Sequence, residues 1–119
     1  MRKEPLIFLN HILESIRNIE EYSKGLTKEK LTRNIKVQDA IIRRIEIIGE
    51  AIKSLPTNFI KKYSEVPWKE IAGTRDKLIH GYFGVDLDIV WKIVREDISQ
   101  LKKMVQGILI KESKWNFIS

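Results

Sequence analysis

The chain has 119 residues and a formal net charge of +6, with 43% hydrophobic and 32% charged residues. This length suits one domain with a single core, so we expect one domain over residues 1–119. The absence of cysteine excludes disulfides and Cys-based zinc sites, two histidines are too few for a histidine-rich metal site, and no apolar run is long enough to cross a membrane. The expectation is therefore a cytoplasmic protein with neither metal nor cofactor.

The positive net charge suits an anionic partner such as RNA, or an acidic protein. The basic residues are spread evenly along the chain, however, and acidic residues accompany them throughout. A basic surface would have to be assembled by folding or by dimerisation. A solvated helical surface explains the same composition equally well.

The first half of the chain predicts two long helices. Residues 5–24 carry apolar residues at three- and four-residue steps and are followed by Gly25, a typical helix end. Thr27 is a suitable cap for a short helical turn after it. Residues 35–55 show the same periodicity and stop at Pro56.

Some residues of the second long helix suggest more than packing. Gly49 costs about 1 kcal/mol relative to Ala in mid-helix, which predicts a close backbone approach, with a merely tolerated glycine as the alternative. Glu50 either faces the candidate site and holds Arg75 or is a surface carboxylate, and the sequence favours neither. Arg43 and Arg44 are either solvated or phosphate-facing, and the sequence leaves this open as well.

The second half predicts shorter helices and then one long one. A short helix is expected over residues 57–63, and Pro67 opens another that Gly73 interrupts. A new turn then runs from Thr74 to His80. Asp86 reads as the N-cap of the last helix. Apolar residues follow at alternating four- and three-residue steps, which predicts a heptad seam: Leu87, Trp91, Val94, Ile98, Leu101, Val105 and Ile108. The expected fold is all-α, an antiparallel up-and-down bundle of four to five helices.

The residues that carry chemistry are concentrated in one short stretch. Arg75, Asp76, His80 and Tyr82 lie within eight residues. Arg75 and His80 would lie about 140° apart around an ideal helix. They can meet on one substrate only if the helix ends between them or if a second copy supplies one of them. Asp76 lies one turn before His80, where its carboxylate would fix the tautomer and favour the imidazolium.

This stretch resembles the signature of a known superfamily. Arg75, His80 and Tyr82 form an Arg-x4-His-x-Tyr pattern similar to that of the HEPN superfamily, and more narrowly of its HepT-like branch, the toxin half of HepT/MntA toxin–antitoxin pairs. Three further stretches agree with it: Ile48–Ala51, Pro67–Gly73 and Tyr82–Asp86. The similarity covers about residues 5–110. Arg-x4-His alone is a weak pattern, but these stretches at these distances make it fairly specific.

The same residues suit metal-independent RNA cleavage. A base takes the proton of a 2′-OH, an acid protonates the leaving 5′-oxygen, and a cation stabilises the charged transition state. The resemblance implies the same chemistry, with His80 as general acid and base, Arg75 binding the phosphate, and the cleft formed between two protomers of a homodimer. Asp76 would orient His80. Without the resemblance, a buried polar cluster at a helix end is the favoured interpretation.

The resemblance also implies a partner. In HepT-like proteins the tyrosine of the motif, here Tyr82, receives AMP from an MntA-like nucleotidyltransferase antitoxin. The expected protein is therefore an RNase toxin of a type VII-like pair, with tRNA as one candidate substrate. The alternative is a non-catalytic helical subunit that binds nucleotide or RNA beside a minimal nucleotidyltransferase. A purely structural helical dimer is a third interpretation.

Overall fold

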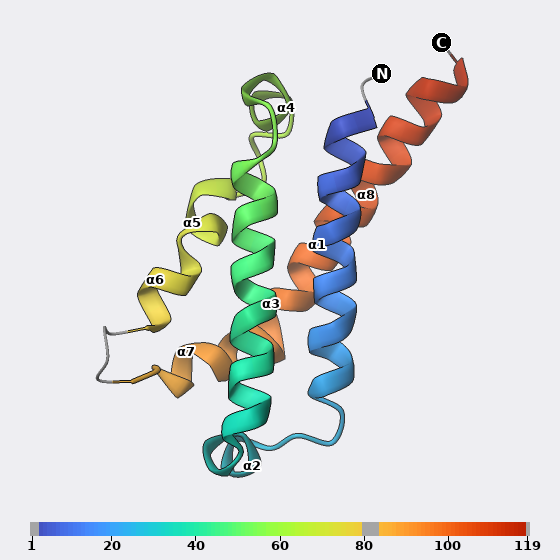
Figure 1. Cartoon of the computed structure of the whole chain (residues 1–119). Helices are drawn as coiled ribbons and strands as arrows, with labels where there is room; N and C mark the ends of the chain where they lie inside the picture. Colours follow the sequence, from blue (N-terminus) through green and yellow to red (C-terminus); the bar gives the residue numbers. More distant parts are fainter. Residues whose placement is uncertain (1–2, 80–83, 119) are drawn as a thin grey trace.

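The computed structural model describes residues 3–79 and 84–118, and the side chains of residues 5–79 and 84–113. Within these residues the chain is helical, apart from connecting turns and one isolated bridge (Figure 1). The elements, in chain order, are α1 Lys3–Tyr22, α2 Lys28–Arg33, α3 Ile35–Lys53, α4 Thr57–Lys62, α5 Trp68–Ala72, α6 Thr74–Leu78, α7 Leu87–Lys92, the π-helical turn η1 Ile93–Asp97, and α8 Ile98–Ile118.

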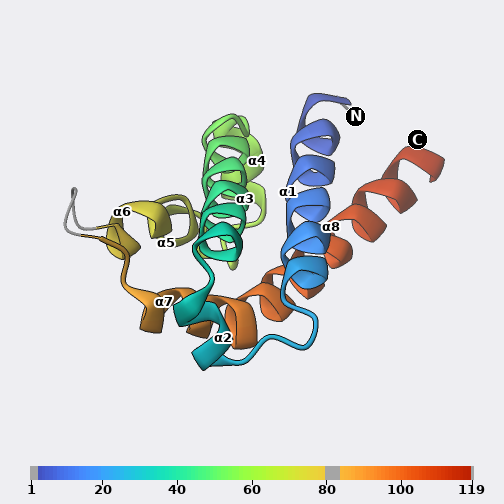
Figure 2. The ribbon, with the colours of Figure 1, turned by 60° about the horizontal axis from the view of Figure 1, so that its bottom comes forward.

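The elements form an up-and-down bundle with four members. α1 and α3 run in opposite directions and pack along most of their length, and α5 with α6 forms a third member on the far side of α3 (Figure 1). The continuous run of α7, η1 and α8 is the fourth, and it crosses beneath the others before it reaches α1 (Figure 2). The all-α expectation is confirmed. No helix of the described residues is long and apolar enough to span a membrane.

The core consists mainly of the aliphatic stripes that the sequence predicts. The buried leucine and isoleucine residues of the two long N-terminal helices are Leu9, Ile12, Leu13, Ile16, Ile19, Ile41, Ile42, Ile45, Ile48 and Ile52. Complete burial of one such side chain is worth about 1.5–3 kcal/mol. The antiparallel pair of α1 and α3 is therefore the main scaffold on which the shorter helices pack.

Two predicted helix caps are confirmed. Thr27 Oγ1 accepts a hydrogen bond from the backbone N–H of Lys30 at 3.1 Å, and α2 begins at the next residue. Asp86 Oδ1 accepts from the N–H of Ile89 at 3.2 Å, at the start of α7. Each cap satisfies an amide that the first turn of a helix leaves without a partner.

The predicted seam of the last helix is correct only in its second half. From Ile98 onward the predicted positions are buried, but before it the buried residues are Val90 and Ile93, while Leu87, Trp91 and Val94 are only partly buried. The reason is the π-helical turn at residues 93–97, which fits one more residue into a turn than an α-helix does. It therefore rotates the preceding residues around the helix axis.

The helix that was expected to reach His80 ends earlier, at Leu78. Ile79 is extended, with φ −108° and ψ 118°, and forms an isolated antiparallel bridge with Val85. The N–H of Asp86 donates to the Leu78 carbonyl at 2.7 Å, an acceptor that a longer helix would have used itself. A helix end therefore lies between Arg75 and His80. This was the condition for the two residues to act on one substrate within a single chain.

Candidate functional site

A close contact between backbones brings the α5–α6 member against α3. A Cβ atom added at Gly49 would lie 3.1 Å from the carbonyl oxygen of Ala72. This is closer than a side chain is normally placed, so glycine allows the last turn of α5 to rest on α3. The close approach predicted at Gly49 is confirmed. It places Arg75, in the following helix, within reach of α3.

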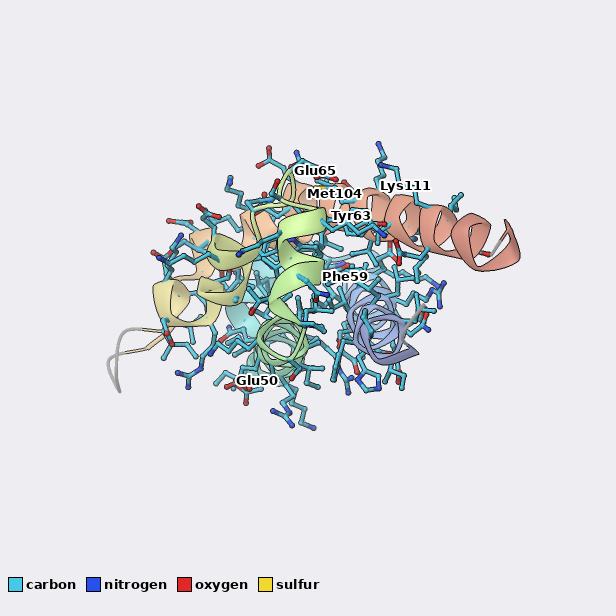
Figure 3. All side chains as sticks on the ribbon, turned by 90° about the horizontal axis from the view of Figure 1, so that it is seen from above. Glu50, Phe59, Tyr63, Glu65, Met104 and Lys111 are labelled. Atoms are coloured by element: carbon cyan, nitrogen blue, oxygen red, sulfur yellow. The ribbon has the colours of Figure 1, made fainter. Side chains whose placement is uncertain are left out.

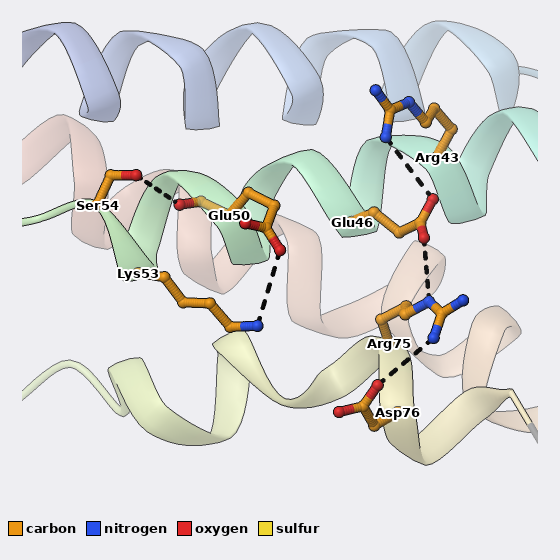
Figure 4. A network of polar contacts seen from close by, with 7 residues as sticks. All are labelled: Arg43, Glu46, Glu50, Lys53, Ser54, Arg75 and Asp76. Carbon is orange, nitrogen blue, oxygen red and sulfur yellow. Dashed lines mark hydrogen bonds and ion pairs between the residues drawn. The ribbon is translucent and has the colours of Figure 1, made fainter.

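Arg75 is held by a carboxylate of α3. Its Nε donates to Oε2 of Glu46 at 3.0 Å, and its Nη1 lies 3.6 Å from Oδ1 of Asp76 (Figure 4). The side chain remains 47% exposed. A guanidinium has five N–H donors, so the contact with Glu46 fixes its orientation and leaves other donors for an anion.

Glu50 has a different partner from the one considered for it. It lies 3.7 Å from Nζ of Lys53 and is 74% exposed (Figure 4). It lines the same hollow as Arg75 but does not hold Arg75, so each of the two alternatives is met in part. The carboxylate that holds Arg75 is Glu46, one turn earlier in α3, and the sequence reasoning missed it. Both glutamates lie on the same helix one turn apart. Only the position at which α6 meets α3 decides between them.

These side chains surround an open hollow of about 440 Å³ between α3 and the α5–α6 member. Its lining consists of Arg43, Ile45, Glu46, Gly49, Glu50, Lys53, Ala72, Arg75 and Asp76. Basic and acidic side chains are equally numerous in this lining. An anion in this hollow would therefore be held by directed N–H groups rather than by a general excess of positive charge.

His80 and Tyr82 lie outside the described residues. The structure does describe residues on either side of them. Ile79, directly after α6, forms an isolated antiparallel bridge with Val85. The described chain on both sides of this gap therefore lies at the end of α6, the helix that carries Arg75. Asp76 is 82% exposed and contacts Arg75, and its one-turn spacing to His80 no longer lies within a helix. Its role toward His80 stays a proposal.

The sequence comparisons show the family of the chain. The chain matches the family "Ribonuclease HepT-like" over residues 12–108. It belongs to this family. The match includes α3, α5 and α6, and it confirms the resemblance stated from Arg75, His80 and Tyr82 at the level of the family.

Several curated relatives of this HepT-like chain carry ribonuclease names. A Methanocaldococcus jannaschii protein named "Gamma-glutamylcyclotransferase and putative RNase" is 55% identical over 92% of this chain, which spans 49% of that relative. A "Putative RNase" of Caldanaerobacter subterraneus subsp. tengcongensis is 47% identical over 92% of this chain and 98% of the relative. A "Probable ribonuclease HepT" of Thermococcus cleftensis is 46% identical over 86% and 93%. No solved structure matches the chain significantly.

A second polar cluster of the HepT-like chain joins α8 to α4 and to the residue that follows α4. Glu112 of α8 is 2% exposed and accepts hydrogen bonds from Lys62 Nζ, at 2.8 Å, and from the Tyr63 hydroxyl. Burial works to raise the pKa of Glu112, but the bonds from Lys62 and Tyr63 outweigh it and leave the pKa lowered. Burial and the Glu112 carboxylate raise the pKa of Tyr63.

The two polar clusters are separate. Tyr63 and Lys111 lie on one side of α4, and Glu50 lies on the other (Figure 3). Within the described residues, no group of three or more His, Cys, Asp or Glu side chains is arranged to hold a metal ion.

Proposed function

We propose that this chain is a metal-independent endoribonuclease, with Arg75 binding the scissile phosphate and His80 acting as general acid and base. The observation that carries the proposal is the placement of Arg75. Its guanidinium is fixed by Glu46 at an open hollow, and α6 ends three residues later, before His80. The HepT-like family and the ribonuclease names of the relatives support the same activity.

The reaction is an internal transesterification. The 2′-oxygen forms a bond to phosphorus, the bond from phosphorus to the 5′-oxygen breaks, and the products are a 2′,3′-cyclic phosphate and a free 5′-hydroxyl. His80 takes the 2′-OH proton, and a protonated imidazole delivers a proton to the leaving oxygen. Acid–base assistance of this kind is worth typically 10²–10⁴-fold. Arg75 stabilises the negative charge of the pentacoordinate phosphorus.

One histidine cannot be base and acid at the same moment. A homodimer that brings two copies of His80 to one cleft would supply both groups. We therefore include the dimer in the proposal. Size-exclusion chromatography with light scattering measures the oligomeric state, and mixing of Arg75→Ala and His80→Ala protomers measures whether the two copies complement each other.

The proposal extends to regulation through Tyr82. An MntA-like nucleotidyltransferase would transfer AMP from ATP to its hydroxyl, with release of pyrophosphate, and so silence the ribonuclease toxin. The physical reason is direct, because an AMP phosphodiester two residues from His80 would compete with RNA for Arg75. Mass spectrometry after coexpression should find one added AMP per chain, absent in Tyr82→Phe. An unmodified Tyr82 in the presence of active nucleotidyltransferase would contradict this part of the proposal.

The deciding experiment is incubation of the purified protein with total tRNA in EDTA, beside His80→Ala and Arg75→Ala. We expect cleavage by the unmodified protein, products with 2′,3′-cyclic phosphate ends, and a loss of at least 100-fold in each variant. Circular dichroism melts show whether the variants are folded. Cleavage that requires added Mg²⁺, or that persists in His80→Ala, would refute the mechanism.

A second candidate function is a non-catalytic subunit that binds RNA or nucleotide beside a nucleotidyltransferase. The observation in its favour is the pairing of Arg75 with Glu46 and Asp76, because these carboxylates reduce the positive charge that Arg75 offers to a transition state. This candidate predicts no cleavage by protein that is unmodified at Tyr82. It also predicts a stable complex with the nucleotidyltransferase, measurable by copurification.

A further inference from the structure

Glu46 contacts two arginines rather than one. Its Oε2 accepts the hydrogen bond from Arg75 of α6, and its Oε1 lies 3.9 Å from Nη1 of Arg43, one turn earlier on α3 (Figure 4). All three side chains line the hollow. The carboxylate thus stands between two guanidiniums that come from different members of the bundle.

The exposure of the three groups shows which of them face solvent. The Glu46 side chain is 31% exposed, whereas Arg75 is 47% and Arg43 is 66% exposed. The carboxylate is the most covered member, and the guanidiniums lie outside it. At 3.9 Å the contact of Arg43 with Glu46 is too long for a hydrogen bond, so the N–H donors of Arg43 remain available to a ligand.

Electrostatics explain why a carboxylate is needed between the arginines. Two guanidiniums that approach each other repel, and a carboxylate shared between them offsets this repulsion. The group of Arg43, Glu46 and Arg75 keeps a charge of +1. Asp76 lies near Arg75 but is 82% exposed, where water and salt screen its charge.

The neighbouring arginine is placed differently. Successive residues of an α-helix lie about 100° apart around its axis, so Arg43 and Arg44 cannot share one face. Arg43 belongs to the lining of the hollow, and Arg44 does not. The sequence left both arginines as either solvated or phosphate-facing. The structure distinguishes them and supplies a matched control for experiments on Arg43.

We propose that Arg43 is a second RNA-binding residue, which holds a phosphate next to the one on Arg75, and that Glu46 is the positioning residue that orients Arg75 beside Arg43. The ligand class is a single RNA strand, recognised through two adjacent phosphodiesters and not through its bases. The inference rests on the proposed function, because it takes the phosphate on Arg75 as the scissile one.

Binding is measured with His80→Ala protein and a fluorescein-labelled, unstructured RNA oligonucleotide of mixed sequence, over a series of salt concentrations. Loss of one phosphate contact to single-stranded nucleic acid should reduce the slope of log K against log salt by about 0.7. We expect this for Arg43→Ala. Arg43→Lys keeps the charge and should keep the slope, and Arg44→Ala should match the parent protein.

Glu46 is tested by cleavage kinetics in protein that retains His80. A positioning role predicts that Glu46→Gln lowers kcat at least 10-fold with little change in KM, and that Glu46→Asp recovers part of the loss. A merely electrostatic role predicts the opposite pattern, because removal of a carboxylate would tighten RNA binding and leave kcat unchanged. Thermal melts of each variant separate these effects from loss of fold.

The outcomes distinguish this inference from the proposed function. An Arg43→Ala slope equal to that of Arg44→Ala, or an unchanged kcat in Glu46→Gln, overturns the inference while cleavage by the parent protein stands. Absence of any cleavage refutes the proposed function, and the salt slope of Arg43→Ala still decides whether that residue binds a phosphate. A parent protein that binds no RNA overturns both.

Discussion

Gly49 links the packing of the bundle to the candidate site at the scale of a single residue. It lies inside α3, one turn before the last residue, where glycine lowers helix stability by about 1 kcal/mol relative to alanine. The contact with the carbonyl of Ala72 is the structural reason for it. The same contact positions α6, and therefore the distance from Arg75 to Glu46. A residue without a side chain thus determines where a functional side chain lies.

Substitution of Gly49 tests this link. Gly49→Ala places a methyl group 3.1 Å from a backbone oxygen that belongs to a short, packed helix. Overpacking costs about 1–3 kcal/mol, which should exceed the gain in helix propensity. We expect a lower melting temperature and, since α6 must shift, reduced RNA cleavage.

Gly107 in α8 is the matched control for this substitution. A Cβ at Gly107 meets nothing within 4 Å, so Gly107→Ala should stabilise the protein by about 0.5–1 kcal/mol and leave cleavage unchanged. Equal effects of the two substitutions on stability would show that the contact with Ala72 is unimportant. Denaturant titration gives both free energies.

At the scale of single residues, some features could be predicted from the sequence and others could not. Caps at Thr27 and Asp86 and the close approach at Gly49 are local properties of residue types, and all three could be predicted. The choice of Glu46 over Glu50 as the partner of Arg75 could not be predicted, because both side chains have the same chemistry and lie one turn apart. It depends on which turn of α3 faces Arg75 when α6 packs against it, and Gly49 predicts a close approach to α3 without fixing that position.

At the scale of elements, the π-helical turn η1 is the feature that the sequence did not predict. The apolar residues keep a regular heptad spacing through it, so no breaker residue marks the turn. Its effect appears only in burial, because Ile93 and Ile98 are buried neighbours five residues apart, while later steps are three or four. The turn therefore has the properties of a one-residue insertion into a regular helix.

A single-residue deletion tests the insertion interpretation. Removal of the exposed Glu96 would bring Ile93 and Ile98 to a four-residue step and make the buried seam regular from Val90 onward. We expect a folded, helical variant with stability within about 1 kcal/mol of the parent, since no core residue is lost.

Deletion of Gln106 is the control, because it also removes an exposed residue but from a regular part of α8. It would rotate the following residues by about 100° and take Ile108 out of the core. A loss of about 2–5 kcal/mol is expected, as for removal of a buried aliphatic side chain. If the two deletions destabilise the protein equally, η1 is a required part of the fold and not an inserted residue.

At the scale of the whole molecule, the bundle is elongated, with extents of 51 × 29 × 20 Å. The last turns of α8 diverge from α1 at one end (Figure 2). Near that end, the buried Glu112 ties α8 to Lys62 of α4 and to the following residue, Tyr63. The hollow that Arg75 lines lies elsewhere, between α3 and the α5–α6 member. Glu112, Lys62 and Tyr63 can therefore be substituted without changing any residue that lines the hollow.

This separation leads to a prediction about stability and pH. The pKa of Glu112 is lowered in the folded protein from its ordinary value of 4.5, so the folded state favours the ionised carboxylate. Its contribution to stability is present above pH 4.5 and is lost as the pH falls through the folded pKa. The Tyr63 pKa is raised from 10.0, so that contribution is lost only in alkaline solution.

Glu112→Gln should therefore flatten the acid side of the stability profile, measured as the free energy of unfolding by urea between pH 3 and pH 7. Tyr63→Phe removes one hydrogen bond to a charged group and should cost about 1.5–3 kcal/mol at pH 7. Glu65→Gln, an exposed carboxylate beside the same cluster, is the control and should keep the profile of the parent. RNA cleavage at neutral pH should be equal in the folded Glu112→Gln and parent proteins. A profile that keeps its full acid slope in Glu112→Gln would show that other carboxylates cause the acid loss of stability.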